Sequence, residues 1–361
     1  MFKLTTAIRR ATGRVAVKLS HVGAKAALLA AVVIAIAACQ GSPPGGPGVP
    51  GPRTTSRPSS HGAAWKDFVA PAAMSGCPSS ACSDILAQVQ VGAGTRSVPQ
   101  DLTPSIQDAS KDLLLAPDGG DCSELPVSGL ETRDQPCVFS AGVSATAPMM
   151  VLIGNSRALM WSRTLLSIAT QLGYRFSLVA HEGCSMPRVA NPPRTGAVSA
   201  AECKGWEDAA INWINQQNPA VVFVASGPDL SEAVTPDELT AGYAATLDEL
   251  KAPARKVFVF GEVPRLDQDP PNCLAAHSSD ALKCAAPPSV SASGDEQQAV
   301  LKAAQQSGAA YVNVTPWLCT EELCPAIVGH YLAYRDQRHL TSTFTEALSP
   351  VLQQAINIGH A

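Results

Sequence analysis

The chain has 361 residues, of which 46% are hydrophobic and 16% are charged, a composition that suits a protein with a sizeable folded core. Six of its 26 basic residues lie in residues 1–25, which contain no acidic residue, so the remaining chain carries 20 basic and 30 acidic side chains. An acidic body of this kind argues against nucleic acid as a partner.

The basic N-terminus is followed by an apolar run, AALLAAVVIAIAAC, at residues 26–39. This run is short for a membrane-spanning helix, which needs about 20 residues, but it fits the hydrophobic part of a secretion signal. Its last residues, Ile36-Ala37-Ala38-Cys39, are typical of a bacterial lipoprotein signal. We therefore predict that residues 1–39 are a signal peptide or lipoprotein signal, with lipidation at Cys39. An uncleaved membrane anchor is the alternative, and both interpretations place the body outside the cytoplasm, in the cell envelope or on the outer face of the bacterial cytoplasmic membrane.

Two weakly patterned segments come next. Residues 40–62 are rich in Pro, Gly and Ser, and such a segment buries too little apolar area to fold. We predict a linker there. Residues 63–148 show weak periodicity and many turn residues, which predicts an irregular, cysteine-rich lead-in pinned by disulfides.

Ten cysteines remain when Cys39 is set aside, and along the chain they fall into five close pairs: Cys77 and Cys82, Cys122 and Cys137, Cys184 and Cys203, Cys273 and Cys284, and Cys319 and Cys324. Proximity favours disulfides between neighbours, although ten cysteines permit many connectivities. Zinc binding is the competing interpretation, but the sequence contains no Cys-x2-Cys and no histidine at zinc-finger spacing. Disulfides form and persist in oxidising compartments, so this interpretation agrees with an exported protein.

From residue 149 the chain alternates short β-branched runs with longer helical patterns. Strands are predicted at 149–154, 175–180, 220–226, 256–262 and 310–316. Helices are predicted at 158–173, 205–217, 236–251, 295–308 and 342–357. The continuous apolar run VVFVA in the third strand is typical of a parallel sheet covered on both faces. Five strands with helical crossovers predict an α/β domain over residues 149–358, in which ligands bind at the carboxyl ends of the strands.

Ser156 follows the first predicted strand directly, in the corner Gly154-Asn155-Ser156-Arg157. It could be a nucleophile, although most serines in such corners only cap the next helix. Asp336 and His339 stand three positions apart after the last strand, a spacing that puts both side chains on one side of a turn. The carboxylate could then hold Nδ1 of the imidazole while Nε2 faces Ser156. A chance surface pair is the alternative.

Several segments match segments of a known protein family and occur in the same order along the chain: VPQDLTPSIQDASKDL at 98–113, VLIGNSRALMW at 151–161, EGC at 182–184, CKGW at 203–206, PPNCLA at 270–275, WLCTEELCP at 317–325 and YRDQRHLT at 334–341. With them, the stretch from about residue 97 to 350 resembles the SGNH domain attached to, or working beside, membrane acyltransferases of the acyltransferase-3 type. This domain is part of the SGNH/GDSL hydrolase superfamily.

The resemblance implies an SGNH, flavodoxin-like three-layer sandwich with a five-stranded parallel sheet and a disulfide-pinned N-terminal extension. It also implies O-acyl transfer or ester hydrolysis on a cell-envelope glycan, through an acyl-enzyme. Ser156 would be the nucleophile, His339 the general base and Asp336 its orienter, with no metal and no diffusible cofactor. The chain lacks the many membrane spans of the usual acyl-donor module, so a transferase would need a membrane acyltransferase-3 partner.

The family usually has Gly-Asp-Ser-His around the serine, whereas this chain has Gly154-Asn155-Ser156-Arg157, so it departs from the family at Asn155 and Arg157. A cation at a helix N-terminus opposes the helix dipole. Arg157 could therefore bind an anionic acyl or acceptor group, with Asn155 beside it, or it could turn outward to solvent. The backbone N–H of Ser156 is the natural first donor of an oxyanion hole, and further candidates stand at the ends of the second and third strands: Gly183, Ser226 and Gly227.

Two classes of function therefore stay open. The complete set of Ser156, Asp336 and His339 favours an enzyme, either an O-acyltransferase or an acylesterase. The altered Asn155 and Arg157 favour a catalytically weak or inactive protein that binds glycan or docks onto a membrane acyltransferase-3 partner. No motif identifies the acyl group or the acceptor sugar, and none separates transfer from hydrolysis.

Overall fold

A computed structural model describes residues 80–113, 122, 137–140, 142–189, 198–227, 234–291 and 294–361. All of them belong to one structural unit, Pro58–Ala361, which is distinct from Met1–Arg57. The predicted signal, the lipidation site Cys39 and the linker at 40–62 lie outside the described residues, as does the lead-in before residue 80.

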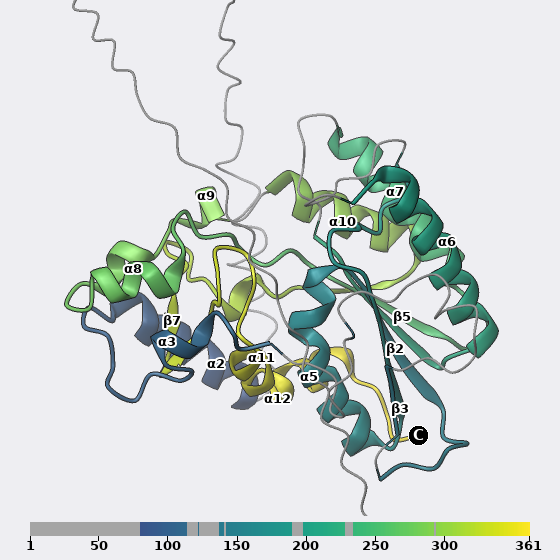
Figure 1. The fold of residues 1–361 in the computed structure, drawn as a ribbon, viewed down its shortest axis with the longest axis horizontal. Coiled ribbons are helices and arrows are strands. Elements are labelled where there is room, and N and C mark those ends of the chain that lie inside the picture. The colour runs from purple at the N-terminus through teal and green to yellow at the C-terminus, as the bar shows by residue number, and fades with distance from the viewer. Residues whose placement is uncertain are drawn as a thin grey trace, which may run out of the picture. The chain divides into compact units, whose positions relative to one another are not determined.

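A six-stranded sheet lies at the centre of the described residues, in the order β1-β3-β2-β4-β5-β6 (Figure 1). Five strands run parallel and correspond to the five that the sequence predicts: β2 (Met149–Gly154), β3 (Arg175–Ala180), β4 (Val221–Ala225), β5 (Lys256–Phe260) and β6 (Ala310–Val312). The predicted α/β fold with a parallel sheet is therefore confirmed. The sixth strand, β1 (Val138–Phe139), pairs antiparallel with β3, and its two residues are too few to produce a sequence pattern.

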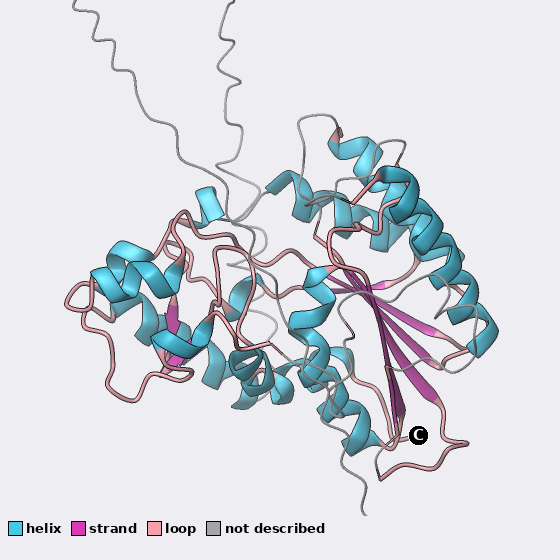
Figure 2. Cartoon of the chain, viewed as in Figure 1, coloured by secondary structure: helices cyan, strands magenta, loops and turns pink. Residues whose placement is uncertain are grey.

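Helices cover both faces of the sheet and produce three layers (Figures 1 and 2). On one face, α5 (Ser156–Leu172) packs against α11 (Ser342–Ala347) and α12 (Ser349–Ile356). On the other face lie α6 (Ala200–Gln217), α7 (Pro236–Glu249) and α10 (Gly294–Ser307), with α7 and α10 in extensive contact. Every residue of β2 and β4 is buried, as expected for strands with helices on both sides.

Aromatic side chains join the helices to the sheet. Trp161 of α5 stacks on Phe260 of β5, with ring centroids 4.8 Å apart. Within the sheet, Phe223 of β4 stacks on Phe258 of β5 at 4.9 Å. Such pairs contribute about 0.5–1.5 kcal/mol beyond the area that they bury. The core therefore fixes α5, the helix that begins with Ser156, against the middle of the sheet.

The remaining elements belong to the lead-in and to the loops at the carboxyl edge: α2 (Ser80–Gly94), α3 (Ile106–Ala109), α8 (Pro270–Ala276), the 3₁₀ helix Ala281–Cys284, α9 (Pro288–Ser291), the 3₁₀ helix Thr315–Trp317, β7 (Ile327–Val328) and β8 (Tyr331–Leu332). The lead-in is thus not irregular throughout. The buried residues of α2 recur at helical spacing: Cys82, Ile85, Val89 and Gly92. Cys and Gly among them weaken the hydrophobic signal, which explains why the pattern predicted no helix there.

The order in which strands are added to the sheet reverses at β2. From this first parallel strand the chain moves outward to β3 and then crosses back to β4 on the other side. In doubly wound sheets the crevice at such a point, outside the carboxyl ends of the strands, is the usual ligand site. Gly154 ends β2 there with φ of +155°, and a Cβ at this position would lie 1.9 Å from the carbonyl oxygen of Ala225. Only glycine lets β2 and β4 approach so closely.

Candidate active site

Ser156 lies at this reversal point, as the first residue of α5. The helix cap is Asn155, whose Oδ1 accepts the backbone N–H of Arg157 at 3.0 Å. Ser156 is therefore not needed as a cap, and its hydroxyl is available for another partner.

That partner is His339, whose Nε2 lies 2.8 Å from Oγ of Ser156. On the other side of the ring, Nδ1 lies 2.8 Å and 3.0 Å from the two carboxylate oxygens of Asp336. An ionised carboxylate only accepts hydrogen bonds, so the proton of a neutral imidazole belongs on Nδ1. Nε2 is then an acceptor for the Ser156 hydroxyl. The structure thus brings together the three side chains that the sequence suggested, in a Ser-His-Asp arrangement.

Hydrogen bonds within the loop that carries Asp336 and His339 fix its conformation. Oδ1 of Asp336 accepts the backbone N–H groups of Arg338 and His339, both at 2.9 Å. The backbone N–H of Arg335 donates to the carbonyl of His339, which closes the turn. The carboxylate is therefore oriented by its own backbone before it meets the imidazole.

Contacts with α5 fasten this loop to the helix that carries Ser156. Thr341 caps α11 by accepting the N–H of Phe344, and Thr345 of α11 donates its hydroxyl to the carbonyl of Met160 at 2.8 Å. Nucleophile and base thus lie on elements that pack directly on each other, which limits changes in the distance between them.

Burial and nearby charges set the protonation of the dyad. Burial disfavours the imidazolium form and lowers the pKa of His339, and the cations Arg157 and Arg335 act in the same direction, whereas Asp336 opposes them. Burial alone would raise the pKa of Asp336, but hydrogen bonds from His339 and from the backbone of Arg338 outweigh it. The result is a pKa of Asp336 well below its usual range. An ionised Asp336 beside a neutral His339 is the state that a general base requires.

Arg157 does not face solvent. Its side chain is only 11% exposed, and its Nη2 lies 3.5 Å from Oε2 of Glu262, which is 7% exposed. Glu262 follows β5 at the carboxyl edge of the sheet. The sequence does not single out Glu262 as a site residue, because the predicted strand 256–262 includes it as its last residue. The strand ends at Phe260, and an acid two positions after an apolar strand is the signal that could have identified it.

Asn155 is also buried, and both ends of its amide have partners within the protein. Besides capping α5, it donates from Nδ2 to the carbonyl of Gly227, beyond the end of β4, at 2.9 Å. An aspartate could not make this donation when ionised. Asn155 thereby links the carboxyl ends of β2 and β4.

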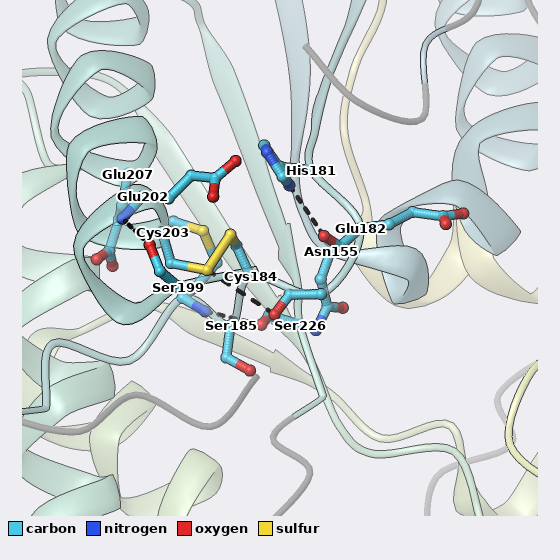
Figure 3. Close-up of a disulfide and its surroundings, with 12 residues drawn as sticks. Asn155, His181, Glu182, Cys184, Ser185, Ser199, Glu202, Cys203, Glu207 and Ser226 are labelled. Carbon is cyan, nitrogen blue, oxygen red and sulfur yellow. Dashed lines mark hydrogen bonds between the residues drawn. A yellow bond between two sulfur atoms is a disulfide. The ribbon is translucent and has the colours of Figure 1, made fainter. Parts of the chain in front are cut away.

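Ser226, one of the candidate oxyanion residues, lies close to Asn155 at the same edge (Figure 3). Ser226 follows β4, and its Oγ accepts the N–H of Met186, while the carbonyl of Gly227 accepts from Ser185 at 3.4 Å as well as from Asn155. Gly183 lies in the turn after β3 with φ of +79°. The structure therefore places Ser226 and Gly227 beside Asn155, the residue before Ser156.

Four disulfides join cysteines that are neighbours in sequence: Cys122–Cys137, Cys184–Cys203, Cys273–Cys284 and Cys319–Cys324. Cys82 is disulfide-bonded as well, and Cys77, its expected partner, lies outside the described residues. Disulfides persist in oxidising compartments, so these bonds indicate an extracytoplasmic protein. Within the part of the chain that the structure describes, no helix is long and apolar enough to span a membrane. The same part contains no group of three or more His, Cys, Asp or Glu side chains suited to a metal ion.

Comparison with known families adds the decisive observation. The family model "SGNH domain (fused to AT3 domains)" matches residues 121–354, a range that contains Ser156, Asp336 and His339. The chain belongs to this SGNH family. Membership is consistent with an acyltransferase or an esterase, and the family's description associates the SGNH domain with AT3, or acyltransferase-3, domains.

Two solved structures are similar to this SGNH protein. The periplasmic domain of a lipopolysaccharide acetyltransferase from Salmonella ser. Paratyphi A matches with a TM-score of 0.51 and 17% identity, over 67% of this chain and 93% of that one. A protein described as a GDSL-like lipase from Parabacteroides merdae matches with a TM-score of 0.36 and 10% identity, over 60% of this chain and 98% of that one. At 17% identity, the similarity to the acetyltransferase domain shows that the two proteins share a fold. A search of the curated proteins finds no match.

Proposed function

We propose that this SGNH protein is an extracytoplasmic serine O-acyltransferase or acylesterase that acts on a cell-envelope glycan through an acyl-enzyme. Ser156 is the nucleophile, His339 the general base and Asp336 its orienter. The observation that carries the proposal is the continuous hydrogen-bond chain from Oγ of Ser156 to Nε2 of His339, and from Nδ1 to Asp336, with 2.8 Å at both steps.

In the first half-reaction, Oγ of Ser156 attacks the carbonyl carbon of an acyl ester while its proton moves to Nε2 of His339. Asp336 stabilises the imidazolium that forms and remains ionised, in keeping with its lowered pKa. When the tetrahedral intermediate collapses, the ester C–O bond breaks and the leaving alcohol takes the proton from Nε2. The acyl group remains on Ser156.

The second half-reaction repeats these steps with a new alcohol or with water. Neutral His339 takes a proton from the incoming O–H, and the oxygen attacks the acyl-Ser156 carbonyl. Water gives the free acid, which makes the protein an esterase, whereas a sugar hydroxyl gives a new ester, which makes it a transferase. Which one occurs depends on whether a bound acceptor excludes water.

The developing oxyanion needs donors on the side of the carbonyl opposite the base. The backbone N–H of Ser156, at the start of the 17-residue helix α5, is the first of these. We assign the others to Gly183 and to the Ser226-Gly227 corner, which Asn155 holds next to Ser156 by donating to the carbonyl of Gly227. Asn155 and Arg157 have protein partners in Gly227 and Glu262, which favours positioning roles over the substrate-binding roles expected from the sequence.

A transferase also requires a source of acyl groups. The family's description links the SGNH domain to AT3 domains, and we therefore propose a membrane acyltransferase-3 protein as partner. Attachment to the membrane, through lipidated Cys39 as the mature N-terminus or through residues 1–39 as an uncleaved anchor, would keep the SGNH domain near such a partner.

The test is covalent labelling of the full chain, exported to an oxidising compartment and purified. Wild-type protein is incubated with a fluorophosphonate and, separately, with a p-nitrophenyl ester, and the adduct is measured by mass spectrometry. We expect one adduct on Ser156 and ester turnover, both lost in Ser156→Ala. Addition of an envelope oligosaccharide then separates the two activities, because a transferase moves the acyl group to the sugar and an esterase releases the acid.

Ser167→Ala is the matched control, because Ser167 lies on the same helix and its hydroxyl only accepts from Gln171 at an exposed position. It should label like wild type. A correctly folded wild-type protein that takes up no probe would overturn the enzyme proposal and favour a protein that binds glycan or docks onto the membrane partner.

A further inference from the structure

The corner after β4 and the loop after β3, to which we assign the oxyanion donors, are hydrogen-bonded to each other. The backbone N–H of Met186 donates to Oγ of Ser226 at 2.9 Å, and the hydroxyl of Ser185 donates to the carbonyl of Gly227 at 3.4 Å. Met186, Ser185 and Ser226 are all buried. The two segments therefore form one buried unit at the carboxyl edge of the sheet.

Helix α7 holds this unit through two buried hydroxyl groups. Tyr243 donates to the carbonyl of Ser226 at 2.5 Å, and Thr246 donates to the carbonyl of Met186 at 2.5 Å. Neither Tyr243 nor Thr246 is exposed to solvent. One turn of α7 thus contacts both segments, and through Tyr243 it contacts the backbone of the Ser226-Gly227 corner directly.

The hydrogen bond from Tyr243 also fixes the direction of one backbone N–H. The carbonyl of Ser226 and the N–H of Gly227 belong to the same planar trans peptide, in which the two groups point in opposite directions. Helices α7 and α5 cover opposite faces of the sheet (Figure 1). Because the carbonyl is turned toward α7, the N–H of Gly227 is directed toward the side of α5, the helix that Ser156 begins.

This N–H has no acceptor among the residues that the structure describes. The carbonyl of Gly227, in contrast, accepts from Nδ2 of Asn155 at 2.9 Å, which ties the corner to the residue before Ser156. The next residue is Pro228, which has no N–H, so Gly227 carries the last backbone donor of the corner. Buried N–H groups without an acceptor are rare in folded proteins. A fixed donor of this kind beside a nucleophile is what an oxyanion hole requires.

We propose that Tyr243 is a positioning residue of the oxyanion hole, whose hydroxyl fixes the Ser226-Gly227 peptide so that the N–H of Gly227 donates to the oxyanion formed on the acyl group at Ser156. This inference rests on the proposed function and deepens it, because it names the donor atom and the residue that orients it. A donor that is oriented before the substrate binds needs no reorganisation in the transition state, which is why it contributes to the rate.

The first test is Tyr243→Phe, which removes the hydroxyl and keeps the buried ring. We expect kcat for a p-nitrophenyl ester to fall about 10- to 100-fold, less than the roughly 10²- to 10³-fold that is lost when an oxyanion donor is removed outright. kcat/KM should fall by the same factor, because the oxyanion exists only in the transition state and the tetrahedral intermediate. The acid limb of kcat/KM should keep its midpoint, because the hydrogen bonds of His339 to Ser156 and Asp336 are not altered.

Tyr174→Phe is the matched control. Tyr174 is also buried and also donates its hydroxyl to a backbone carbonyl, that of Gly359 at 3.3 Å, but it directly precedes β3 and so lies at the opposite edge of the sheet. Both variants should lose some stability to urea, whereas only Tyr243→Phe should lose activity. A normal kcat in folded Tyr243→Phe, or an equal loss of kcat in the two variants, would overturn the inference.

The second test observes the donor itself by NMR, in protein labelled with ¹⁵N-glycine and with the Gly227 signal assigned through the carbonyl of Ser226. Reaction of Ser156 with a fluorophosphonate attaches a phosphoryl oxygen that mimics the oxyanion. The amide proton of Gly227 should move downfield in this adduct, and by less in the adduct of Tyr243→Phe. An adduct on Ser156 with an unmoved Gly227 signal would overturn the inference alone. A wild-type protein that takes up no fluorophosphonate would refute the proposed function, and this inference with it.

Discussion

The hydroxyl of Ser156 lies 2.8 Å from Nε2 of His339, although 183 positions separate the two residues in the chain. The contact exists because Ser156 begins α5 and the loop before α11 is fastened to the same helix. Packing between α5 and α11 thus brings two distant segments of the sequence into hydrogen-bonding contact.

Asp336→Asn should lower kcat for ester cleavage by about 10³- to 10⁴-fold. An asparagine keeps an oxygen for the backbone N–H groups of Arg338 and His339, so the turn should survive. It cannot stabilise the imidazolium, and its amide can hold the ring in the wrong tautomer. Stopped-assay turnover with circular dichroism as a folding control checks this, and a folded Asp336→Asn protein with near-normal kcat would remove Asp336 from the mechanism.

The acid limb of kcat/KM should lie below pH 6.5, the usual pKa of histidine. The pKa of His339 is lowered, so the imidazole stays neutral and able to accept a proton as the pH falls, and activity is lost only below its shifted value. Asp336, with its pKa lower still, remains ionised over this range. Rates on a neutral ester between pH 4 and 8 measure the limb; a midpoint above 7 would contradict the lowered pKa.

Asn155→Asp should destabilise the fold by about 1–3 kcal/mol, the usual cost of leaving a buried polar group without its partner. Aspartate can still cap α5 through one oxygen, but it cannot donate to the carbonyl of Gly227 and places a second oxygen against it. Urea denaturation measures the loss, with Asn155→Ala, which removes both bonds, as comparison. A variant as stable as wild type would show that the link between β2 and β4 contributes nothing.

Glu207→Gln should make thermal stability less dependent on pH. Glu207 is buried beside Arg188, and burial raises its pKa to about 8. In the unfolded chain its pKa is about 4.3, so the folded protein holds the proton more tightly, and wild type loses stability as the pH rises from about 4.3 to 8. The Tm difference between the variant and wild type should therefore grow in the variant's favour from pH 5 to 8. A constant difference would mean that Glu207 is ionised throughout.

Much of the fold was predictable because its signals are local. The apolar run VVFVA became the buried strand β4, and five such runs with helical spacers determined a parallel sheet. The positions of Ser156, Asp336 and His339 relative to the strand ends could be predicted for the same reason. In a parallel sheet all carboxyl ends meet at one edge.

The surroundings of the site could not be predicted in this way. Pairing of Arg157 with Glu262 depends on β5 lying two strands from β2, and on Gly227 leaving room between them, and neither relation is local. The role of Asn155 likewise depends on a carbonyl 72 positions away. The helix α2 was missed for a different reason, because Cys82 and Gly92 dilute the apolar face that packs on β7.

The Cys184–Cys203 disulfide joins the turn after β3, which we assign to the oxyanion hole, to helix α6 (Figure 3). In a reducing cytosol this bond does not form, and the turn keeps only its hydrogen bonds, such as those that join Ser185 and Met186 to the end of β4. Under the proposed function, export would therefore also be the step at which this turn gains its covalent link to α6.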